Sequence, residues 1–340
     1  MGCPMFVRAC ATALALTFGV TAFAQEPDAD KRGTFSATYE NDIFAGTDRG
    51  YTNGVLFQYI SAADEVPDFL NPVQDNLTWL TAAEKWHWSV GLGQNMYTPQ
   101  DLTVANPSPD DRPYAGFLYA SIGLIADDNR PDVGILDVLQ LDIGVTGPAS
   151  LAEKTQVFVH DLLDTTDPQG WDTQIENEVA FRLLYERIWK TGDDKNDIPL
   201  IDLEYDITPH VGGALGTAET YVGAGVGFRI GDDLEDDYGP PRVRPALGGP
   251  GFFEDKDGFS WYIFSGIAAR AVARDMFVEG NLFQDSAGVD LKHLQGDLQS
   301  GFAIQVFRTE FAFTYVVRSP QFQGQDNFSK FGSVNARFRF

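Results

Sequence analysis

Cysteine is almost absent from the sequence. The two cysteines, Cys3 and Cys10, both lie within the first 24 residues. The rest of the chain therefore has neither a disulfide framework nor a thiol nucleophile. It also lacks any apolar run of about 18 residues or more, which excludes membrane-spanning helices from it.

Basic residues are scarce as well. The chain has 24 Lys and Arg against 49 Asp and Glu, a formal net charge of −25. Nucleic-acid binding is excluded because no basic patch is present to neutralise phosphates. An acidic protein can still work at an anionic surface when divalent cations bridge the two.

The N-terminus has the pattern of a secretory signal. Arg8 precedes a short apolar run that ends in Ala22-Phe23-Ala24, a typical cleavage sequence. We therefore predict a signal peptide at residues 1–24, removed before Gln25. A retained anchor is disfavoured because the run is shorter than the roughly 20 residues of a span.

Alternation of apolar and polar residues dominates residues 25–340. In SVNARFRF (333–340), Val334, Ala336, Phe338 and Phe340 share one face, and LDVLQLDIGV (136–145) alternates in the same way. Such segments of about ten residues are typical of transmembrane β-barrels, although a soluble β-sandwich alternates too. The signal peptide, the terminal Phe340 and the missing disulfides favour an outer-membrane barrel.

Strands are predicted in thirteen segments, whereas bacterial barrels close on even numbers. The predicted fold class is therefore all-β, a transmembrane antiparallel β-barrel of twelve strands with one of the thirteen segments wrong. The segments are 34–44, 51–62, 86–96, 114–126, 135–146, 177–189, 200–212, 219–230, 258–271, 275–285, 297–307, 310–318 and 331–340.

One segment, residues 147–164, breaks the alternation. Pro148 lies near its start, and Ser150 with Glu153 three residues later fits a capping box. We predict a short helix in a loop between two strands. Gln156 and His160 are four residues apart, so they share one face of that helix.

Common catalytic signatures are missing. The sequence has no G-x-S-x-G, no H-E-x-x-H and no phosphate-binding loop. Of the four histidines, His160 stands out because it lies on the one helical insertion. From the residues alone, packing and function are equally open for it.

A polar hairpin begins the barrel. In TYENDIFAGTDRGYTNGVLFQY (38–59), Asn41 and Asp42 end the first strand and Thr52 opens the return strand. Asn41 and Asp42 are also ordinary turn residues, whose side chains bond their own backbone.

Four motifs together resemble the lipid A 3′-O-deacylase family (LpxR-type) of Gram-negative outer membranes. They are ENDIFAGTDRGYTNG (40–54), DDRPYAGFLYA (110–120), GPASLAEKTQVFVH (147–160) and GWDTQIENE (170–178). The resemblance implies a twelve-stranded barrel with an active site between the barrel wall and a helix from an extracellular loop. It implies calcium-dependent hydrolysis of the ester that holds the 3′-linked acyloxyacyl chain on lipid A.

The resemblance also implies site residues. His160 corresponds to the general base, and Asn41, Asp42 and Thr52 to the other catalytic positions. Carboxylate and amide oxygens suit calcium, so Asp42 and Asn41 are the expected Ca²⁺ ligands. Thr52 as a covalent nucleophile is disfavoured because no dedicated base adjoins it.

Arg112 and Gln156 are the expected substrate contacts, with a salt-bridged turn between Asp111 and Arg112 as the alternative. The chain departs from the family after the histidine, where Thr166 stands at an acidic position. It departs again before DDRPY, where Lys and Arg are missing.

The expected partner is lipopolysaccharide in the outer leaflet, and the protein is expected to be a membrane-embedded monomer of the outer membrane. Three alternatives remain at this point. They are a porin, a structural calcium-binding barrel without catalysis, and a phospholipase A-like esterase.

Overall fold

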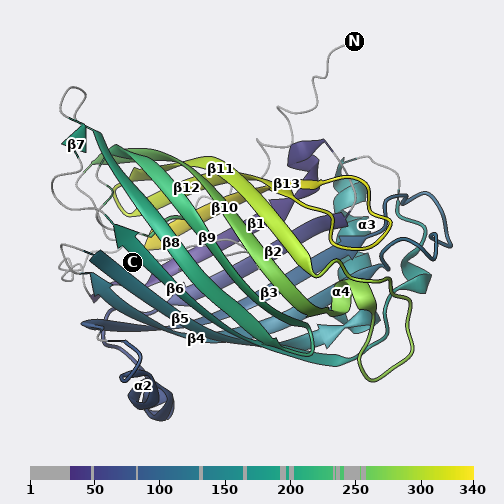
Figure 1. The fold of residues 1–340 in the computed structure, drawn as a ribbon, viewed down its shortest axis with the longest axis horizontal. Helices are drawn as coiled ribbons and strands as arrows, with labels where there is room; N and C mark the ends of the chain where they lie inside the picture. Colours follow the sequence, from purple (N-terminus) through teal and green to yellow (C-terminus); the bar gives the residue numbers. More distant parts are fainter. Residues whose placement is uncertain are drawn as a thin grey trace.

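The computed structural model describes residues 31–46, 50–81, 83–129, 133–163, 167–191, 197–198, 203–232, 234, 238–240, 253 and 258–340. The predicted signal peptide lies outside these residues. The described chain forms an antiparallel barrel with each strand beside its sequence neighbour (Figure 1). The strands are β1 (Thr34–Asn41), β2 (Gly50–Ile60), β3 (Lys85–Thr98), β4 (Ala115–Asn129), β5 (Val133–Thr146), β6 (Val179–Thr191), β7 (Asp197–Ile198), β8 (Leu203–Gly216), β9 (Glu219–Asp232), β10 (Phe259–Asp275), β11 (Leu294–Val306), β12 (Thr309–Arg318) and β13 (Ser329–Arg339).

Twelve of these strands close the barrel. The last strand, β13, pairs with β1, and β6 pairs directly with β8, so the two-residue β7 is only an addition to β8. The prediction of twelve strands is confirmed. None of the described helices is long and apolar enough to cross a membrane. Three helices carry labels: α2 (Asn71–Leu77), α3 (Ala152–Leu163) and α4 (Met276–Glu279).

The wrong strand prediction is 275–285, where the structure has α4 and an irregular loop. Asp275 accepts a hydrogen bond from the amide of Phe277 at 2.9 Å and caps the helix. Met276, Phe277 and Val278 are all fully buried. Three consecutive buried side chains fit a helical turn, whereas a strand turns alternate residues to opposite faces.

The inside of the barrel is filled by paired charges. Arg182 lies between Asp142, at 2.8 Å, and Glu219, with none of these side chains exposed by more than 2%. Arg318 pairs with Asp297 at 2.8 Å in the same way. Tyr238, in the connection from β9 to β10, is buried, and its hydroxyl donates to Asp127 on the inner wall at 2.8 Å.

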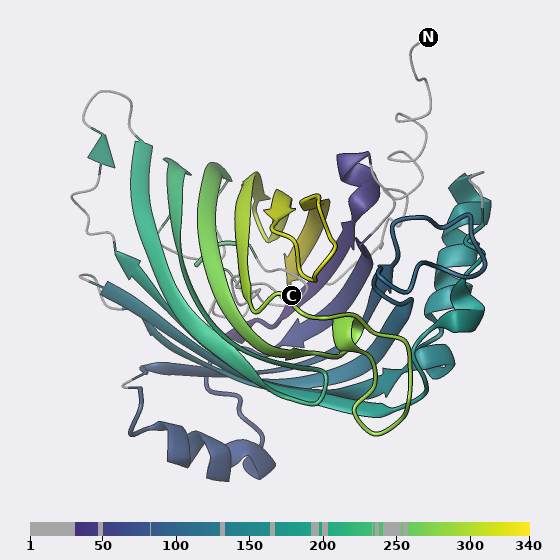
Figure 2. The same ribbon diagram turned by 45° about the vertical axis from the view of Figure 1, so that its right-hand side comes forward.

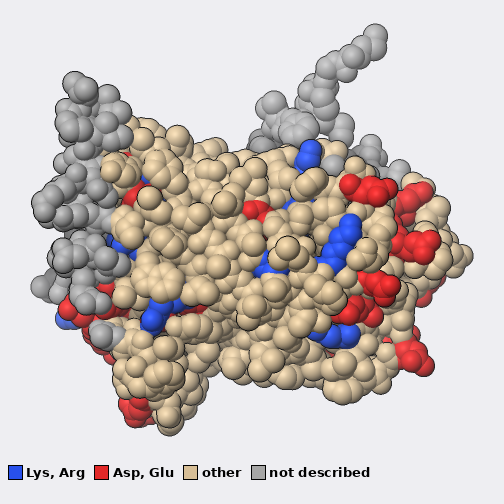
Figure 3. Space-filling model, viewed as in Figure 1, with Lys and Arg blue, Asp and Glu red and all other residues tan. Residues whose placement is uncertain are grey.

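The outside of the barrel is apolar. Phe35, Phe57, Leu92, Ile143 and Phe181 lie at outward strand positions and are 42–56% exposed. Figure 3 shows a face with few charges along its middle, while acidic side chains gather at the end that carries α3 and α4. This is the pattern of an outer-membrane barrel, polar within and apolar toward lipid.

The two ends of the barrel are distinguished by the chain's course. The amide of Phe340 donates to the carbonyl of Gly33 at 3.1 Å, so both ends of the described chain meet at one rim. In bacterial outer-membrane barrels of even strand number this rim faces the periplasm. α3 and α4 are then extracellular, and α2 lies at the periplasmic end (Figures 1 and 2).

Candidate active site on the outer face of the barrel wall

Two amide side chains lie side by side on the outer face of the wall. Along β1 the outward positions run from the exposed Phe35 to Asn41, and along β2 from the exposed Phe57 to Asn53. Asn41 and Asn53 pair directly across the two strands. Directly paired residues share a face of the sheet, so both amides lie on the side of the wall that faces the membrane.

A β-bulge adds Thr52 to this group. Tyr51 pairs with Tyr97 of β3, whereas Asn53 pairs with the very next residue back, Met96. Thr52 is the extra residue, and its hydroxyl lies 2.6 Å from the hydroxyl of Thr98. Bulges are common beside functional sites because they redirect one side chain without ending the strand.

The helix α3 covers this part of the wall. The predicted helix is confirmed, although it begins at Ala152, after a short 3-10 helix (Gly147–Ser150). It contacts β3 and β4, and Gln94 of β3 donates to the carbonyl of Ser150 at 2.7 Å. Figure 2 shows it against the outside of the barrel.

The buried face of α3 presents its polar residues to the wall. Ala152, Gln156 and His160 follow one another at intervals of four residues, and all three are at least nine-tenths buried. Phe158 and Leu162, on another face, are 67% and 68% exposed. Helical spacing therefore separates a polar face toward the barrel from an apolar face toward the surroundings.

A cavity of about 290 Å³ lies between α3 and the wall. It brings together four of the residues predicted from the sequence, Asn41, Thr52, Gln156 and His160, from segments about a hundred residues apart. The complete lining is Asn41, Ile43, Gly46, Thr52, Asn53, Met96, Thr155, Gln156, Val159 and His160. The volume approaches that of small-molecule binding sites, which begin at roughly 300 Å³.

Trp171 fixes the orientation of Gln156. The indole Nε1 of Trp171 donates to Oε1 of Gln156 at 2.7 Å. Since an indole nitrogen only donates, the amide must present its oxygen to Trp171 and its nitrogen elsewhere. Nε2 of Gln156 is buried without a hydrogen-bond partner. The cavity thus has a buried donor that is available to a ligand.

Asn41 and Asp42 differ in their positions. Asn41 lines the cavity, and its Oδ1 also accepts from the amide of Ile43 at 2.8 Å, capping a short 3-10 helix (Asp42–Ala45). The ordinary turn role is therefore present as well. Asp42 is 1% exposed and is not among the lining residues. Tyr39 lies close enough to interact with Asn41, Asn53 and Asp42.

The oxygen atoms at this end of the cavity fit a calcium ion in kind. Asn41, Thr52 and Asn53 contribute amide and hydroxyl oxygens, and Oδ1 of Asn53 is buried without a hydrogen-bond partner. Ca²⁺ takes six to eight oxygen ligands, commonly including carboxylates. Within the described ranges no three His, Cys, Asp or Glu side chains cluster as a metal site. These oxygens would supply part of a calcium coordination shell, and the carboxylate of Asp42 follows Asn41 directly in the sequence.

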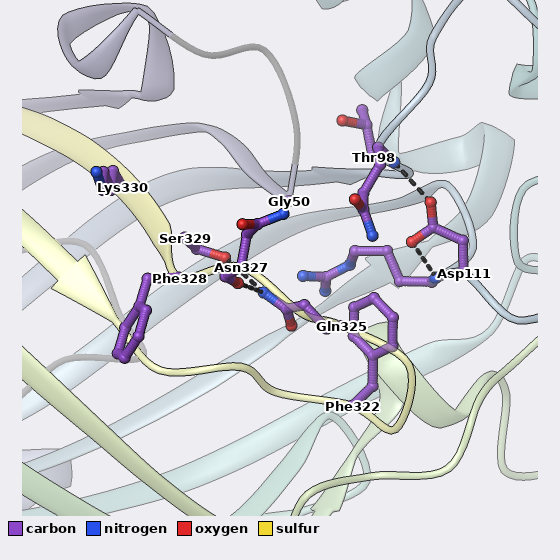
Figure 4. A pocket seen from close by; sticks show the side chains of 11 residues that line it. Gly50, Thr98, Asp111, Phe322, Gln325, Asn327, Phe328, Ser329 and Lys330 are labelled. Carbon is purple, nitrogen blue, oxygen red and sulfur yellow. Dashed lines mark hydrogen bonds between the residues drawn. The ribbon is translucent and has the colours of Figure 1, made fainter.

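Arg112 lies elsewhere, at a second cavity of about 20 Å³ that has room for one water (Figure 4). Its guanidinium donates to the carbonyl of Phe277 at 2.9 Å and stacks on the Tyr97 ring. Burial lowers the pKa of Arg112, and the nearby Asp275 carboxylate opposes this effect. The structure does not bring Arg112 into the large cavity. Asp111 accepts a hydrogen bond from the Arg112 backbone amide at 2.8 Å, which is a turn contact but not the expected side-chain salt bridge.

Two residues of the site were not predicted from the sequence. Asn53 was passed over because it resembles any polar residue at a strand start, and its role follows from its pairing with Asn41. Trp171 carries no predicted role from the sequence, and it both packs on the Tyr114 ring, with 4.8 Å between ring centroids, and donates to Gln156. The GWDTQIENE motif was the signal that marked its neighbourhood.

A cavity with polar residues on the outer wall of a closed twelve-stranded barrel defines this chain as an outer-membrane protein with a candidate site on the outward side of its wall. A family model described as outer membrane protein LpxR matches residues 9–340. The chain therefore belongs to the LpxR family, which confirms the resemblance to the lipid A 3′-O-deacylases.

A solved structure agrees with this fold. LpxR from Salmonella typhimurium superposes with a TM-score of 0.72 at 19% identity, covering 90% of this chain and 100% of that chain. The β domain of the Bordetella autotransporter BrkA is less similar, with a TM-score of 0.47 at 11% identity over 91% of this chain and 100% of that one. Comparison with curated protein sequences found no match.

Proposed function

We propose that the protein hydrolyses the ester that holds the 3′-linked acyloxyacyl chain of lipid A, with water activated by His160 and with dependence on calcium. The observation that carries the proposal is the cavity in which His160, Gln156, Asn41 and Thr52 meet on the lipid-facing side of the wall. A lipid in the outer leaflet reaches this position without leaving the membrane.

The side chains support each proton and charge transfer of an ester hydrolysis. A neutral imidazole of His160 accepts a proton from water as the water oxygen adds to the ester carbonyl carbon. The amide nitrogen of Gln156 donates to the oxyanion that develops on the carbonyl oxygen. Breaking the bond to the sugar oxygen then releases the fatty acid, and imidazolium returns its proton to that oxygen.

Calcium is a proposed cofactor, held by Asn41 and Asp42 with the Asn53 and Thr52 oxygens close by. When bound, it would supply Lewis-acid polarisation of the ester carbonyl. The ion would also offset repulsion between an acidic protein and the phosphates of lipid A. Water and the lipid itself would complete its coordination shell.

The alternatives have less support. None of the described cavity-lining residues is a serine, and the Thr52 hydroxyl is paired with Thr98, so a serine-type phospholipase mechanism is disfavoured. Buried ion pairs such as Arg182 with Asp142 occupy the interior, which disfavours a porin. An activity assay distinguishes our proposal from a barrel without catalysis.

The test uses the purified full-length protein, which we expect to be a monomer, refolded in detergent with lipid A. With calcium present, mass spectrometry should detect loss of the 3′ acyloxyacyl chain, and chelation should abolish it. His160→Ala should lower turnover by about 10²- to 10⁴-fold. The barrel should keep its heat-modifiable migration in gels. Full activity of His160→Ala would show that the assigned base is wrong.

A further inference from the structure

The connection between β2 and β3 forms a projection at the periplasmic end of the barrel. Residues 66–81, which we name the α2 foot, contain a short 3-10 helix (Asp68–Leu70) followed by α2. Figures 1 and 2 show α2 beside the barrel, at the end opposite α3. The sequence indicated only a loop in this region.

One side of the α2 foot packs on the outer wall. Leu77, Leu80 and Thr81 lie against side chains at outward positions of β3 to β6, and Arg187 of β6 donates to the carbonyl of Leu80 at 2.7 Å. The wall residues of this contact are Trp86, Leu124, Ala126, Asp137, Leu139 and Tyr185. The foot is therefore attached to the surface that elsewhere faces lipid.

The strand register gives the depth of this contact. On β5 the outward positions run from Ile143, which is 50% exposed, to Leu139 and then Asp137. Asp137 pairs across the strands with Arg187, and their side chains form an ion pair at 2.7 Å. The charged pair thus interrupts the apolar outward positions after Leu139 and marks the start of the polar boundary, with Ile135 and Trp189 the next outward pair beyond it. The α2 foot lies at this periplasmic membrane interface.

Aromatic residues support the same depth. At this rim Tyr59 contacts Trp88 at 5.9 Å and Phe340 at 6.1 Å between ring centroids. Tyr and Trp concentrate at the two membrane interfaces of outer-membrane barrels. This aromatic cluster therefore marks the periplasmic interface near the level at which the foot projects.

The α2 foot also exposes large apolar side chains. Trp79 is 80% exposed, Phe69 65% and Val73 40%. We propose that the α2 foot inserts these three side chains into the periplasmic leaflet, with phospholipid as the partner. Short interfacial segments bind in this way, with apolar side chains in the leaflet and acidic ones, here Asp68 and Asp75, toward water.

Lipid fits this surface better than a second protein copy does. Three side chains offer far less than the roughly 800 Å² per partner that a stable protein interface buries. The wall to which the foot is attached already faces lipid, so insertion only extends an existing interface. This proposal is independent of the catalytic one.

Trp79 provides a direct test. Wild type and Trp79→Phe are reconstituted in phosphatidylcholine vesicles, with or without bromine on the acyl chains near the headgroup. Subtracting the emission spectrum of Trp79→Phe from that of the wild type gives the fluorescence of Trp79 alone, without that of the other five tryptophans. We expect bromine to quench this difference signal at least about twofold, because interfacial indoles lie at that depth.

Two controls define the result. Trp189→Phe, at an outward position of β6, should give a quenched difference signal, and Trp171→Phe, 2% exposed, should not. Phe69→Ser combined with Val73→Ser should reduce the quenching of Trp79 while lipid A hydrolysis stays unchanged. A Trp79 signal that is unquenched and has the emission of a water-exposed indole overturns the proposal. Protection of Trp79 by self-association in detergent would also overturn it.

Discussion

The inner and outer faces of the barrel wall both carry buried polar groups, but they arrange them in opposite ways. Inside, each of Arg182, Arg229 and Arg318 has a carboxylate partner. The cavity on the outer face is lined by neutral amides, two threonines, His160 and apolar or small residues, with no Asp, Glu, Lys or Arg in its described lining. Paired charges use their hydrogen bonds to hold strands together, whereas the amides of Gln156 and Asn53 retain atoms for a ligand.

The largest expected effect on stability comes from breaking an ion pair inside the barrel. Arg182→Ala should leave Asp142 and Glu219 as uncompensated buried charges and lower the free energy of unfolding by about 3–5 kcal/mol. Arg187→Ala is the matched control on the outer face of the same strand. Its partly exposed pair with Asp137 should cost about 1 kcal/mol or less. Urea titration of gel mobility measures both, and equal losses would contradict the comparison.

The next effect concerns catalysis. Gln156→Leu removes the donor that faces the cavity and should lower kcat by about 10²- to 10³-fold. It also leaves the buried Trp171 indole without its acceptor, which should lower the free energy of unfolding by about 1–3 kcal/mol. Lys154→Leu, on the exposed side of α3, is the control and should change kcat less than about twofold. If both variants lose activity equally, helix packing rather than the amide donor is responsible.

A smaller effect concerns the proposed cation. Asn53→Asp adds a carboxylate to a neutral cavity and should lower the half-activating calcium concentration by about tenfold, since ligand charge tunes calcium affinity. Asn71→Asp on α2 adds the same charge at a distance and should leave that concentration unchanged. An unchanged value for Asn53→Asp places the ion elsewhere.

The smallest effect tests how the donor is oriented. Trp171→Phe keeps the ring but removes the hydrogen bond to Gln156, and about 1 kcal/mol of lost orientation corresponds to roughly fivefold in kcat. In the double variant with Gln156→Leu, the Trp171 effect should vanish, because both changes act through one amide. Additive losses would show that Trp171 acts independently of Gln156.

Much of the fold could be predicted from the sequence because a barrel strand alternates every second residue. The twelve strands and the helix with Gln156 and His160 follow from that period and its interruption. Segment 275–285 was misread because it too is apolar, and only the Asp275 cap shows that it turns. The sequence predicts no helix in the α2 foot because the seven residues of α2 are too few to show a helical period.

The site was predicted in part. Motif resemblance gave Asn41, Thr52 and His160, and helical spacing placed Gln156 beside His160. The structure brings these four residues to one cavity. Asn53 depends on cross-strand register, and Thr52 reaches the cavity through a bulge that no local pattern marks. The prediction that Arg112 contacts the substrate in the same site as His160 is wrong. A sequence motif does not show where a side chain points, and the Arg112 side chain turns toward Phe277 and Tyr97.

A cavity on the outer wall changes how substrate arrives. A site in the lumen would be filled from solution, whereas one beneath α3 is reached by lateral diffusion within a single leaflet. The concentration that governs its occupancy is then the number of lipid molecules per unit area of membrane. Dilution with inert lipid would slow turnover, while adding more membrane of the same composition would not.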